Sequence, residues 1–528
     1  MKNKILLALG GLSVISIAVI FYFVTRSPIK ITSDKRCLRC NVILVSADSV
    51  RADHMGLYGY KKDTTPNLDV WAKDALVFEN YYSSAFLTPV SEASVHSGLY
   101  PEANGIIGFR RTFGTQVKTL AERFHEKGYT TIAHGNSSEF VRYENLNKSF
   151  IRGFDFFHMQ KRFETDTRKV QWEIIKKKIQ STKGPFFFWI PIGDAHSPFG
   201  WNVPPKFSSL NYQGPFAGWG FTGNLEIYYD RKLYELTPER SFHFNGYASK
   251  EPSNYFEEQN LLHSVKKWPY QVTDEDLEFI NSKYDDGVAL VDVEFSELLK
   301  VLKETGHLED TMIVFQSEHG ESLGEHKYVA HYDVMNTQTH VPLIIKSPAI
   351  KEGSRHQNLL SGVDILPTIL HHVGIAVDES ALDGKNFLES GKVLPTRDAV
   401  FITRIPLWET LLKIKDKPQS IFSDLRTIDD QNPNRDYAIV MGNLKLIHRL
   451  ARSVEDKYSV IRYVTGKAPL RQEFELYDLS KDPFEDHILA VDAFPQGAMM
   501  KERLLQFEKM IAAKAVTTFI TKELEDYR

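Results

Sequence analysis

Side chains that could bind a metal ion or act on an ester follow three apolar segments of this sequence. Asp48 ends the segment NVILVSAD, Asp194 and His196 end GPFFFWIPIGDAH, and Glu318 and His319 close TMIVFQSEHG. Continuous apolar runs of this length are typical of buried parallel strands. Ligands of such sheets bind beyond the carboxyl ends of the strands. We therefore expect these side chains to meet at one site.

Thr88 lies in a second segment with chemical potential, FLTPVSEASVHSGLYP. A threonine followed by proline is typical of a helix start, where the hydroxyl can accept a hydrogen bond from a free N–H group. The same position suits a nucleophile, because a helix N-terminus favours the anionic group that would be attacked. From these residues alone, capping is the commoner role and catalysis is the alternative.

The elements that must position these residues alternate between strand and helix. Helical periodicity or helix end signals mark four segments, and buried-strand patterns mark five. The predicted helices are 66–80, 119–128, 279–306 and 364–374, and the predicted strands are 41–48, 129–135, 184–196, 311–320 and 341–348. This alternation predicts an α/β fold with a mainly parallel sheet covered by helices on both faces.

The chain divides into segments of different character. Residues 38–380 form the predicted catalytic domain, and residues 200–270 within it are rich in aromatic residues, glycine and proline, with weak periodicity. Long irregular insertions are commonly functional, and the aromatic content argues against disorder, so we expect a cap over the site. Residues 381–528 contain short strands and a final helix, which predicts a small C-terminal α+β subdomain.

Residues 1–30 predict a membrane segment. Residues 5–24 are uncharged and mostly apolar, which matches the roughly 20 residues that a helix needs to cross a bilayer. We expect an uncleaved anchor, with a cleaved signal peptide or a buried helix as alternatives. The short N-terminal tail favours a catalytic domain outside the cytoplasm, in a bacterial periplasm or at the cell surface.

Charge and cysteine content limit the partners. There are 64 basic and 68 acidic side chains, a net charge near −4, and the sequence contains no long charge run. Nucleic acid is therefore not an expected partner.

Cys37 and Cys40 are the only cysteines, and a local disulfide and two free thiols are equally consistent with their spacing.

A set of ordered motifs resembles the sulfatase family of the alkaline phosphatase superfamily, from about Asn41 to Leu489. The motifs are ADSVRADHMGLYGY, TPVSEASVHSGLYP, GDAHSPF, FQSEHGESLGEH, VDILPTILHHVGI, DGKNF, GNLKLI and ELYDLSKDPFED. The resemblance implies an α/β enzyme that acts on ester bonds. It also implies that Asp48, Glu318 and His319 hold one divalent ion.

The same resemblance assigns the reacting groups. Thr88 would be the nucleophile and a further ligand of the ion, and His196 and His331 would lie beside the transferred group and its leaving oxygen. Ester cleavage of this kind needs a nucleophile, an ion and donors to the non-bridging oxygens. An imidazole in a small site favours zinc or manganese, with calcium or magnesium as alternatives.

Three positions depart from the sulfatase pattern. Thr88 replaces the cysteine or serine from which sulfatases make formylglycine, Glu92 replaces an arginine, and Ser49 replaces a second aspartate. The altered set resembles membrane-anchored phosphoethanolamine transferases and lipoteichoic acid synthases, which use a threonine nucleophile and an acid–histidine pair. In those transferases an aspartate occupies the position of Glu318.

These features predict a metal-dependent enzyme that cleaves or transfers phosphate-ester groups through a covalent Thr88 intermediate. The expected substrate is an anionic ester on a phosphorylated or sulfated glycan or lipid headgroup outside the cytoplasm. One alternative is a sulfuric ester hydrolase that works without formylglycine. The other is an inactive family member that binds anions.

Overall fold

The computed structural model describes most of the chain between residues 36 and 519. The described residues are 36–108, 111–137, 140–141, 144–160, 167–196, 199, 205–214, 273–327, 329–331, 333–395, 397–404, 436–449 and 472–519. The predicted anchor and most of the predicted cap lie outside them. Among the helices within these ranges, none has the length and apolar character needed to cross a membrane.

A central sheet of eight strands forms the middle layer, in the order β10-β2-β9-β6-β1-β5-β3-β4. All neighbouring pairs are parallel except those made by β9. The strands are β1 (Asn41–Ala47), β2 (Leu76–Tyr82), β3 (Thr130–Asn136), β4 (Phe156–Gln160), β5 (Phe186–Ile192), β6 (Thr311–Gln316), β9 (Leu343–Lys346) and β10 (Ser354–Ser361). The predicted α/β fold with a mainly parallel sheet is confirmed.

The register of the three central strands decides where the site forms. Ala47 at the end of β1 pairs with Ile192 of β5, and Ser46 pairs with Gln316 of β6. The residues that follow these strands therefore leave the sheet at the same edge. Asp48 continues the ladder, because its N–H donates to the carbonyl of Ile192 at 2.8 Å.

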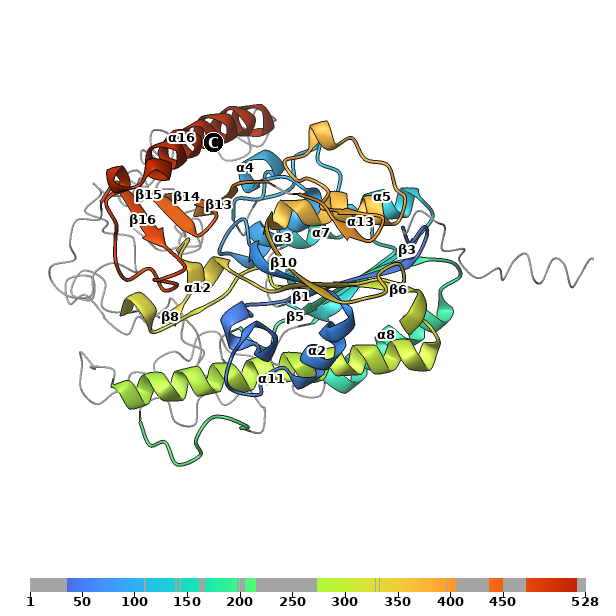
Figure 1. Cartoon of the computed structure of the whole chain (residues 1–528). Helices are drawn as coiled ribbons and strands as arrows, with labels where there is room; N and C mark the ends of the chain where they lie inside the picture. The colour runs from blue at the N-terminus through green and yellow to red at the C-terminus, as the bar shows by residue number, and fades with distance from the viewer. Residues whose placement is uncertain are drawn as a thin grey trace, which may run out of the picture.

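Helices cover both faces of the sheet (Figure 1). Residues of β1 alternate between two apolar cores: Ile43 and Val45 belong to one, and Val42 and Leu44 to the other. The first core is closed by α2 (Pro66–Trp71), α8 (Thr167–Ser181) and α11 (Asp274–Thr305). The second is closed by α3 (Thr88–Ser97), α5 (Leu120–Glu126), α7 (Glu144–Phe150) and α13 (Ile365–His372).

One predicted helix is wrong in its second half. Residues 66–80 were expected to be helical throughout, but α2 ends at Trp71 and strand β2 begins at Leu76. The sequence LVFENYY is rich in residues that favour strands, and β2 is hydrogen-bonded between β9 and β10. Pairing within the sheet therefore outweighs the local helical periodicity.

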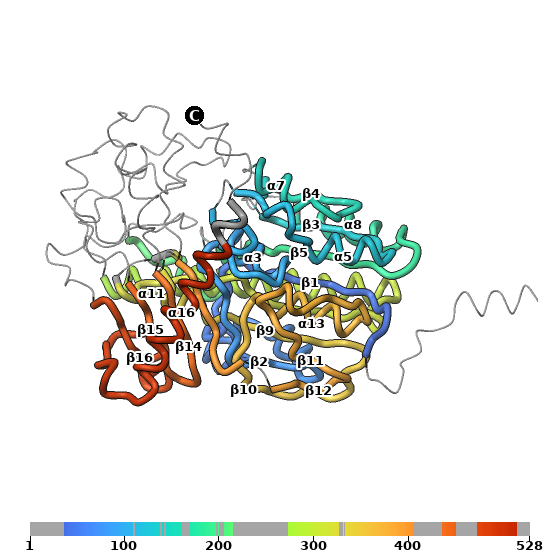
Figure 2. The backbone as a smooth tube through the Cα atoms, turned by 90° about the horizontal axis from the view of Figure 1, so that it is seen from above, coloured from blue at the N-terminus to red at the C-terminus, as the bar shows by residue number. Residues whose placement is uncertain are grey.

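A second, antiparallel sheet lies to one side of the central sheet (Figures 1 and 2). Its strands are β13 (Val400–Arg404), β14 (Asp436–Met441), β15 (Leu444–Arg449) and β16 (Phe474–Asp478). Helix α16 (Pro495–Phe519) packs on it through Met500, Leu504, Phe507 and Ile511. Short elements elsewhere are α4 (Pro101–Asn104), α12 (Asn336–Thr339), β7 (Ser322–Leu323), β8 (Val329–Ala330), β11 (Leu388–Glu389) and β12 (Lys392–Val393).

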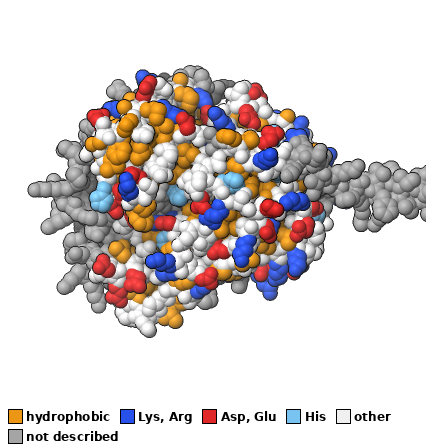
Figure 3. All heavy atoms as spheres, viewed as in Figure 1, with side chains coloured by type: hydrophobic (Ala, Val, Ile, Leu, Met, Phe, Trp, Pro, Cys, Tyr) orange, Lys and Arg blue, Asp and Glu red, His pale blue; other side chains and the backbone are white. Residues whose placement is uncertain are grey.

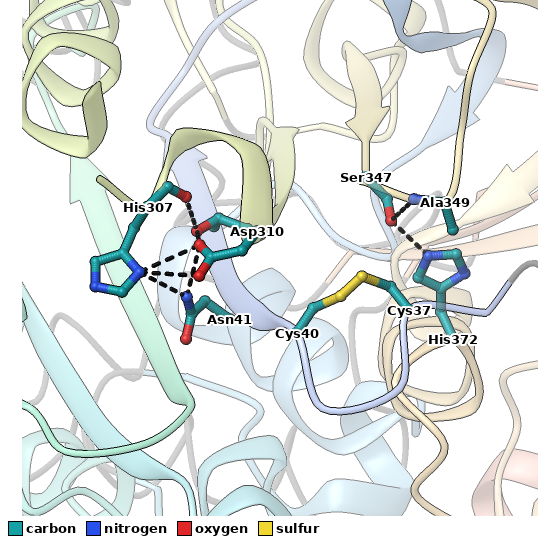
Figure 4. Close-up of a disulfide and its surroundings, with 9 residues drawn as sticks. Cys37, Cys40, Asn41, His307, Asp310, Ser347, Ala349 and His372 are labelled. Carbon is teal, nitrogen blue, oxygen red and sulfur yellow. Dashed lines mark hydrogen bonds and ion pairs between the residues drawn. A yellow bond between two sulfur atoms is a disulfide. The ribbon is translucent and has the colours of Figure 1, made fainter. Parts of the chain in front are cut away.

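Cys37 and Cys40 form a disulfide just before β1 (Figure 4). Both side chains are buried against Ala349. The backbone N–H of Cys37 donates to the carbonyl of His372 at 3.1 Å. The disulfide, one of the two states that the spacing allowed, thus lies where the start of the sheet meets the end of α13.

Candidate active site

Asp48, Glu318 and His319 meet at the carboxyl ends of β1 and β6. One ligand atom from each lies within 4.8 Å of the others, and all three side chains are buried. Apolar strands buried on both faces bring these polar side chains into the interior. The structure therefore brings together the three residues predicted to hold an ion.

Thr88 is the first residue of α3, and its hydroxyl points at this cluster. Its Oγ1 lies 3.0 Å from Nε2 of His319. The N-cap position belongs to Leu87, which makes no side-chain cap, and Thr88 itself is buried. The hydroxyl therefore contacts the candidate ligands, and the capping role is not what the structure shows.

His319 is oriented as a metal ligand would be. Its Nδ1 lies 3.0 Å from the carbonyl of Gly320 and must carry the proton to donate there, which leaves the lone pair of Nε2 facing Thr88. Burial, followed by the neighbouring His331, lowers the pKa of His319 to about 3, so the imidazole is neutral at physiological pH. The same Nε2 lies 3.6 Å from Oδ1 of Asp48. A neutral imidazole lone pair facing a carboxylate is a donor set that a cation would stabilise.

Glu318 gives independent support for a cation. Burial, with the nearby Asp48 and Glu92, raises the pKa of Glu318 well above its usual range. Its Oε2 is buried without a hydrogen-bond partner, and among the described residues no lysine or arginine forms an ion pair with it. The residues present therefore fit a divalent ion held by Asp48, Glu318, His319 and Thr88. When bound, such an ion would offset the carboxylate charge and polarise an ester oxygen.

Glu92 occupies one turn of α3 beyond Thr88. Its Oε1 accepts a hydrogen bond from Nε2 of Gln316 at 3.2 Å, and its Oε2 lies 3.4 Å from Nε2 of His96. The side chain is buried. Where the sulfatase pattern has an arginine, this chain therefore has a buried carboxylate, one turn of α3 after Thr88.

His196 and His331, predicted to serve the transferred group, lie beside the cluster. Their ring centroids are 5.0 Å apart, and the centroid of His331 is 4.1 Å from that of His319. His196 follows β5, and His331 follows β8. The structure therefore gathers all six predicted site residues in one place.

Glu321 is a member of the site that the sequence predictions missed. It is fully buried, and its Oε1 lies 3.0 Å from Nδ1 of His331. Burial raises its pKa to about 7. The hydroxyl of Ser49 lies 3.1 Å from Oδ1 of Asp48 and 3.3 Å from Oε1 of Glu321, between the two carboxylates. The density of acidic and histidine residues in SEHGE was the signal that could have identified Glu321.

The outer surface carries no comparable concentration of charge on the face shown in Figure 3. Among the described side chains visible there, lysine and arginine are interspersed with aspartate and glutamate.

Comparison with known proteins shows the family to which the chain belongs. The model of the sulfatase family matches residues 40–375, so the chain belongs to the sulfatase family. An arylsulfatase of Clostridium perfringens is 25% identical over 374 residues, covering 65% of this chain and 76% of that protein. Members of this class are hydrolases that act on ester bonds.

Solved structures share the fold. A phosphonate monoester hydrolase of Agrobacterium radiobacter superposes with a TM-score of 0.63 at 20% identity, covering 90% of this chain and 96% of that chain. A structure described as a complex with its substrate D-glucosamine-2-N,6-O-disulfate has a TM-score of 0.59 at 20% identity, covering 91% of this chain and 99% of that one. These similarities support the α/β fold.

Proposed function

We propose that this sulfatase-family hydrolase cleaves a phosphate ester through a covalent intermediate on Thr88. The observation that carries the proposal is the Thr88 hydroxyl, 3.0 Å from His319 and beside two buried carboxylates. A buried hydroxyl at a helix start, aimed at an ion site, is placed as an activated nucleophile. The substrate we propose is an anionic ester carried by a glycan or lipid headgroup.

The proposed reaction consists of two displacements. In the first, Oγ1 of Thr88 forms a bond to phosphorus while the bond from phosphorus to the leaving oxygen breaks. His196 and His331 carry a proton to the leaving oxygen, which departs as an alcohol, and the proton lost by Thr88 replaces it on the imidazole. In the second, water attacks phosphorus, the bond to Oγ1 breaks, and a proton from that water restores the Thr88 hydroxyl as phosphate is released. An acceptor alcohol in place of water would make the same chemistry a transfer.

The chemistry of Thr88 favours phosphorus over sulfur. A formylglycine hydrate has a second hydroxyl whose proton loss can expel sulfate, whereas Thr88 has a single oxygen. A sulfated threonine would have to wait for water to attack an anionic sulfur centre. The site also lacks the arginine of the sulfatase pattern, because Glu92 occupies that position.

Hydrolysis of a sulfuric ester is the second candidate. It is favoured directly by the relatives, since the Clostridium perfringens protein is named an arylsulfatase and a similar fold is solved with a disulfated glucosamine. The names of the sequence relatives support sulfate more directly than phosphate. Thr88 would still be the attacking group in this case.

Location outside the cytoplasm, with residues 1–30 as an anchor, is part of the proposal. The apolar run of residues 5–24 supports it. Retention of the chain in the membrane fraction after a high-salt wash tests it, and a mature chain beginning beyond residue 24 would contradict it.

Matched esters test the proposed reaction. The full-length enzyme, loaded with zinc or manganese, is assayed on an aryl phosphate, an aryl phosphodiester and an aryl sulfate that share one leaving group, with and without an acceptor alcohol. We expect a phosphate ester to give the highest kcat/KM. Faster turnover of the sulfate would reject phosphate and support the second candidate.

A further inference from the structure

The segment that carries His331 has little regular structure of its own. His331 directly follows β8, and β8 forms a two-residue antiparallel ladder with β7. So short a ladder holds a neighbouring side chain weakly, since even a full two-stranded hairpin is marginally stable alone. A side chain that serves a reacting group must nevertheless be held to within about 0.5 Å. His331 therefore needs support from outside its own segment.

That support comes from the C-terminal antiparallel sheet, which lies next to β8 and α12 (Figure 1). Asp333, two residues after His331, pairs with Nη1 of Arg449, the last residue of β15, at 2.5 Å. The paired residues are 116 positions apart in the sequence. We propose that Arg449 is a positioning residue of the enzyme, which holds His331 beside the reacting group through Asp333.

The orientation of Arg449 is set by its own sheet. The side chain is buried, its Nε donates to Oε2 of Glu475 at 2.7 Å, and its Nη1 also donates to Oδ2 of Asp436 at 3.1 Å. A guanidinium is planar and rigid, so several charge-assisted hydrogen bonds fix its orientation. Asp333 therefore pairs with a cation whose position is determined by the C-terminal sheet.

Asp333 connects this cation to the backbone around His331. Its Oδ1 accepts a hydrogen bond from the N–H of Val334 at 2.7 Å, and its own N–H donates to Oε1 of Gln338 at 2.7 Å. Nε2 of Gln338 donates in turn to the hydroxyl of Ser322 in β7 at 2.9 Å. The ion pair is thus tied both to the residues after His331 and to the strand that pairs with β8.

The C-terminal subdomain also contacts both ends of segment 326–336. At the start, Nε2 of His326 lies 2.6 Å from the carbonyl oxygen of Phe484. At the end, the N–H of Asn336 donates to Oε2 of Glu485, whose Oε1 pairs with the buried Lys445 of β15 at 2.8 Å. Among these contacts, the pair of Asp333 and Arg449 is the nearest to His331 in the sequence.

Removal of the Arg449 charge would displace the segment. It would leave Asp333, Asp436 and Glu475 buried without this cation. Buried like charges repel one another strongly, and Asp333 lies on the segment that is held least by its own structure. The proposal rests on the proposed function at one point, the transfer of a proton from His331 to the leaving oxygen. A misplacement of about 1 Å can cost about a hundredfold in rate.

Leaving groups of different basicity test this role. An alkoxide needs a proton as it departs, whereas a nitrophenolate can leave without one. The full-length enzyme is assayed on a butyl ester and a 4-nitrophenyl ester of the same phosphate group. We expect Arg449→Met to lower kcat/KM for the butyl ester by about 10²-fold or more, and for the nitrophenyl ester by less than about tenfold.

Asp333→Asn keeps the test decisive if Arg449→Met does not fold. The amide oxygen can still accept from the N–H of Val334, and Arg449 keeps two carboxylate partners. We expect the same selective loss on the butyl ester. In a His331→Gln background, Asp333→Asn should have no further effect on that ester, because the side chain that it positions is gone.

Arg404→Met is the matched control. Arg404 is a buried arginine of the same sheet, and it pairs with Asp436 at 3.3 Å. Its replacement should leave the ratio of the two kcat/KM values within about threefold of the wild type. Equal losses on both esters in Asp333→Asn, the selective loss in Arg404→Met, or an additive loss in the His331→Gln background would overturn the proposal.

Failure of the proposed function would be visible separately. A wild type that turns over sulfates faster than phosphates would reject the phosphate assignment, and butyl and nitrophenyl sulfates would then test Arg449 in the same way. Equal losses on both esters in His331→Gln itself would overturn both the role of His331 at the leaving oxygen and this proposal. A selective loss in His331→Gln without one in Asp333→Asn would overturn the role of Arg449 alone.

Discussion

Replacement of Thr88 by alanine separates catalysis from folding. The substitution removes the hydroxyl that lies 3.0 Å from Nε2 of His319. If this oxygen attacks the ester and also binds the ion, kcat should fall by about four orders of magnitude or more, because nucleophile and ligand are lost together. Thr88→Ser keeps the oxygen and should retain appreciable activity.

The expected cost in stability is small by comparison. Thr88 is buried, so alanine loses one buried methyl group, worth about 0.8 kcal/mol, and one hydrogen bond, worth about 1 kcal/mol. A loss of about 2 kcal/mol in the free energy of unfolding would lower Tm by several degrees at most. The variant should therefore remain folded while its turnover is lost.

Ser91 offers a matched control on the same helix. Its side chain is also buried, and its hydroxyl has no hydrogen-bond partner among the residues that the structure describes. Ser91→Ala should leave kcat within a few-fold of the wild type under the same assay, with Tm followed by calorimetry. If Thr88→Ala stayed within tenfold of the wild-type kcat while folded, the assignment of Thr88 as the nucleophile would be refuted.

The remaining predictions concern pH, a buried ion pair and metal removal. Burial lowers the pKa of His372 to about 4, so between about pH 6.5 and 4 the unfolded chain binds one proton more at this residue than the folded chain does. As the pH is lowered through that window, this residue should therefore reduce the unfolding free energy by about 1.4 kcal/mol per pH unit. His372→Gln should make the pH dependence of the unfolding free energy less steep in urea titrations, and an unchanged slope would contradict the prediction. Lys445 and Glu485 form a fully buried pair at 2.8 Å, so Glu485→Gln should cost about 3–5 kcal/mol in chemical denaturation, and a loss below 1 kcal/mol would disagree. Chelation should abolish turnover and lower Tm, both restored by added zinc or manganese; full activity in metal-free enzyme would rule out the ion site.

The central strands and the first ion cluster could be predicted because their signals are local. Segment 41–48 is apolar on both faces, so its strand character and the position of Asp48 at its end follow from a few consecutive residues. The same holds for Glu318 and His319 after β6. Parallel pairing then places these ends at one edge of the sheet.

Other features depend on contacts between distant segments. The strand within 66–80 was missed because its partners, β9 and β10, lie more than 250 residues further along the chain. Glu321 was missed because its place in the site depends on its contacts with Ser49 and His331, which form only in the folded chain. The contact of the Thr88 hydroxyl with His319 likewise joins residues that are 231 positions apart in the sequence.

Covalent labelling of Thr88 tests the central claim most directly. The full-length enzyme is mixed with an ester radiolabelled at phosphorus, quenched with acid before the first turnover ends, digested and mapped. We predict label in the peptide that contains Thr88, in the wild type and in Thr88→Ser, and none in Thr88→Ala. Turnover of the ester with no label in the wild type, or with label on another residue, would contradict the account.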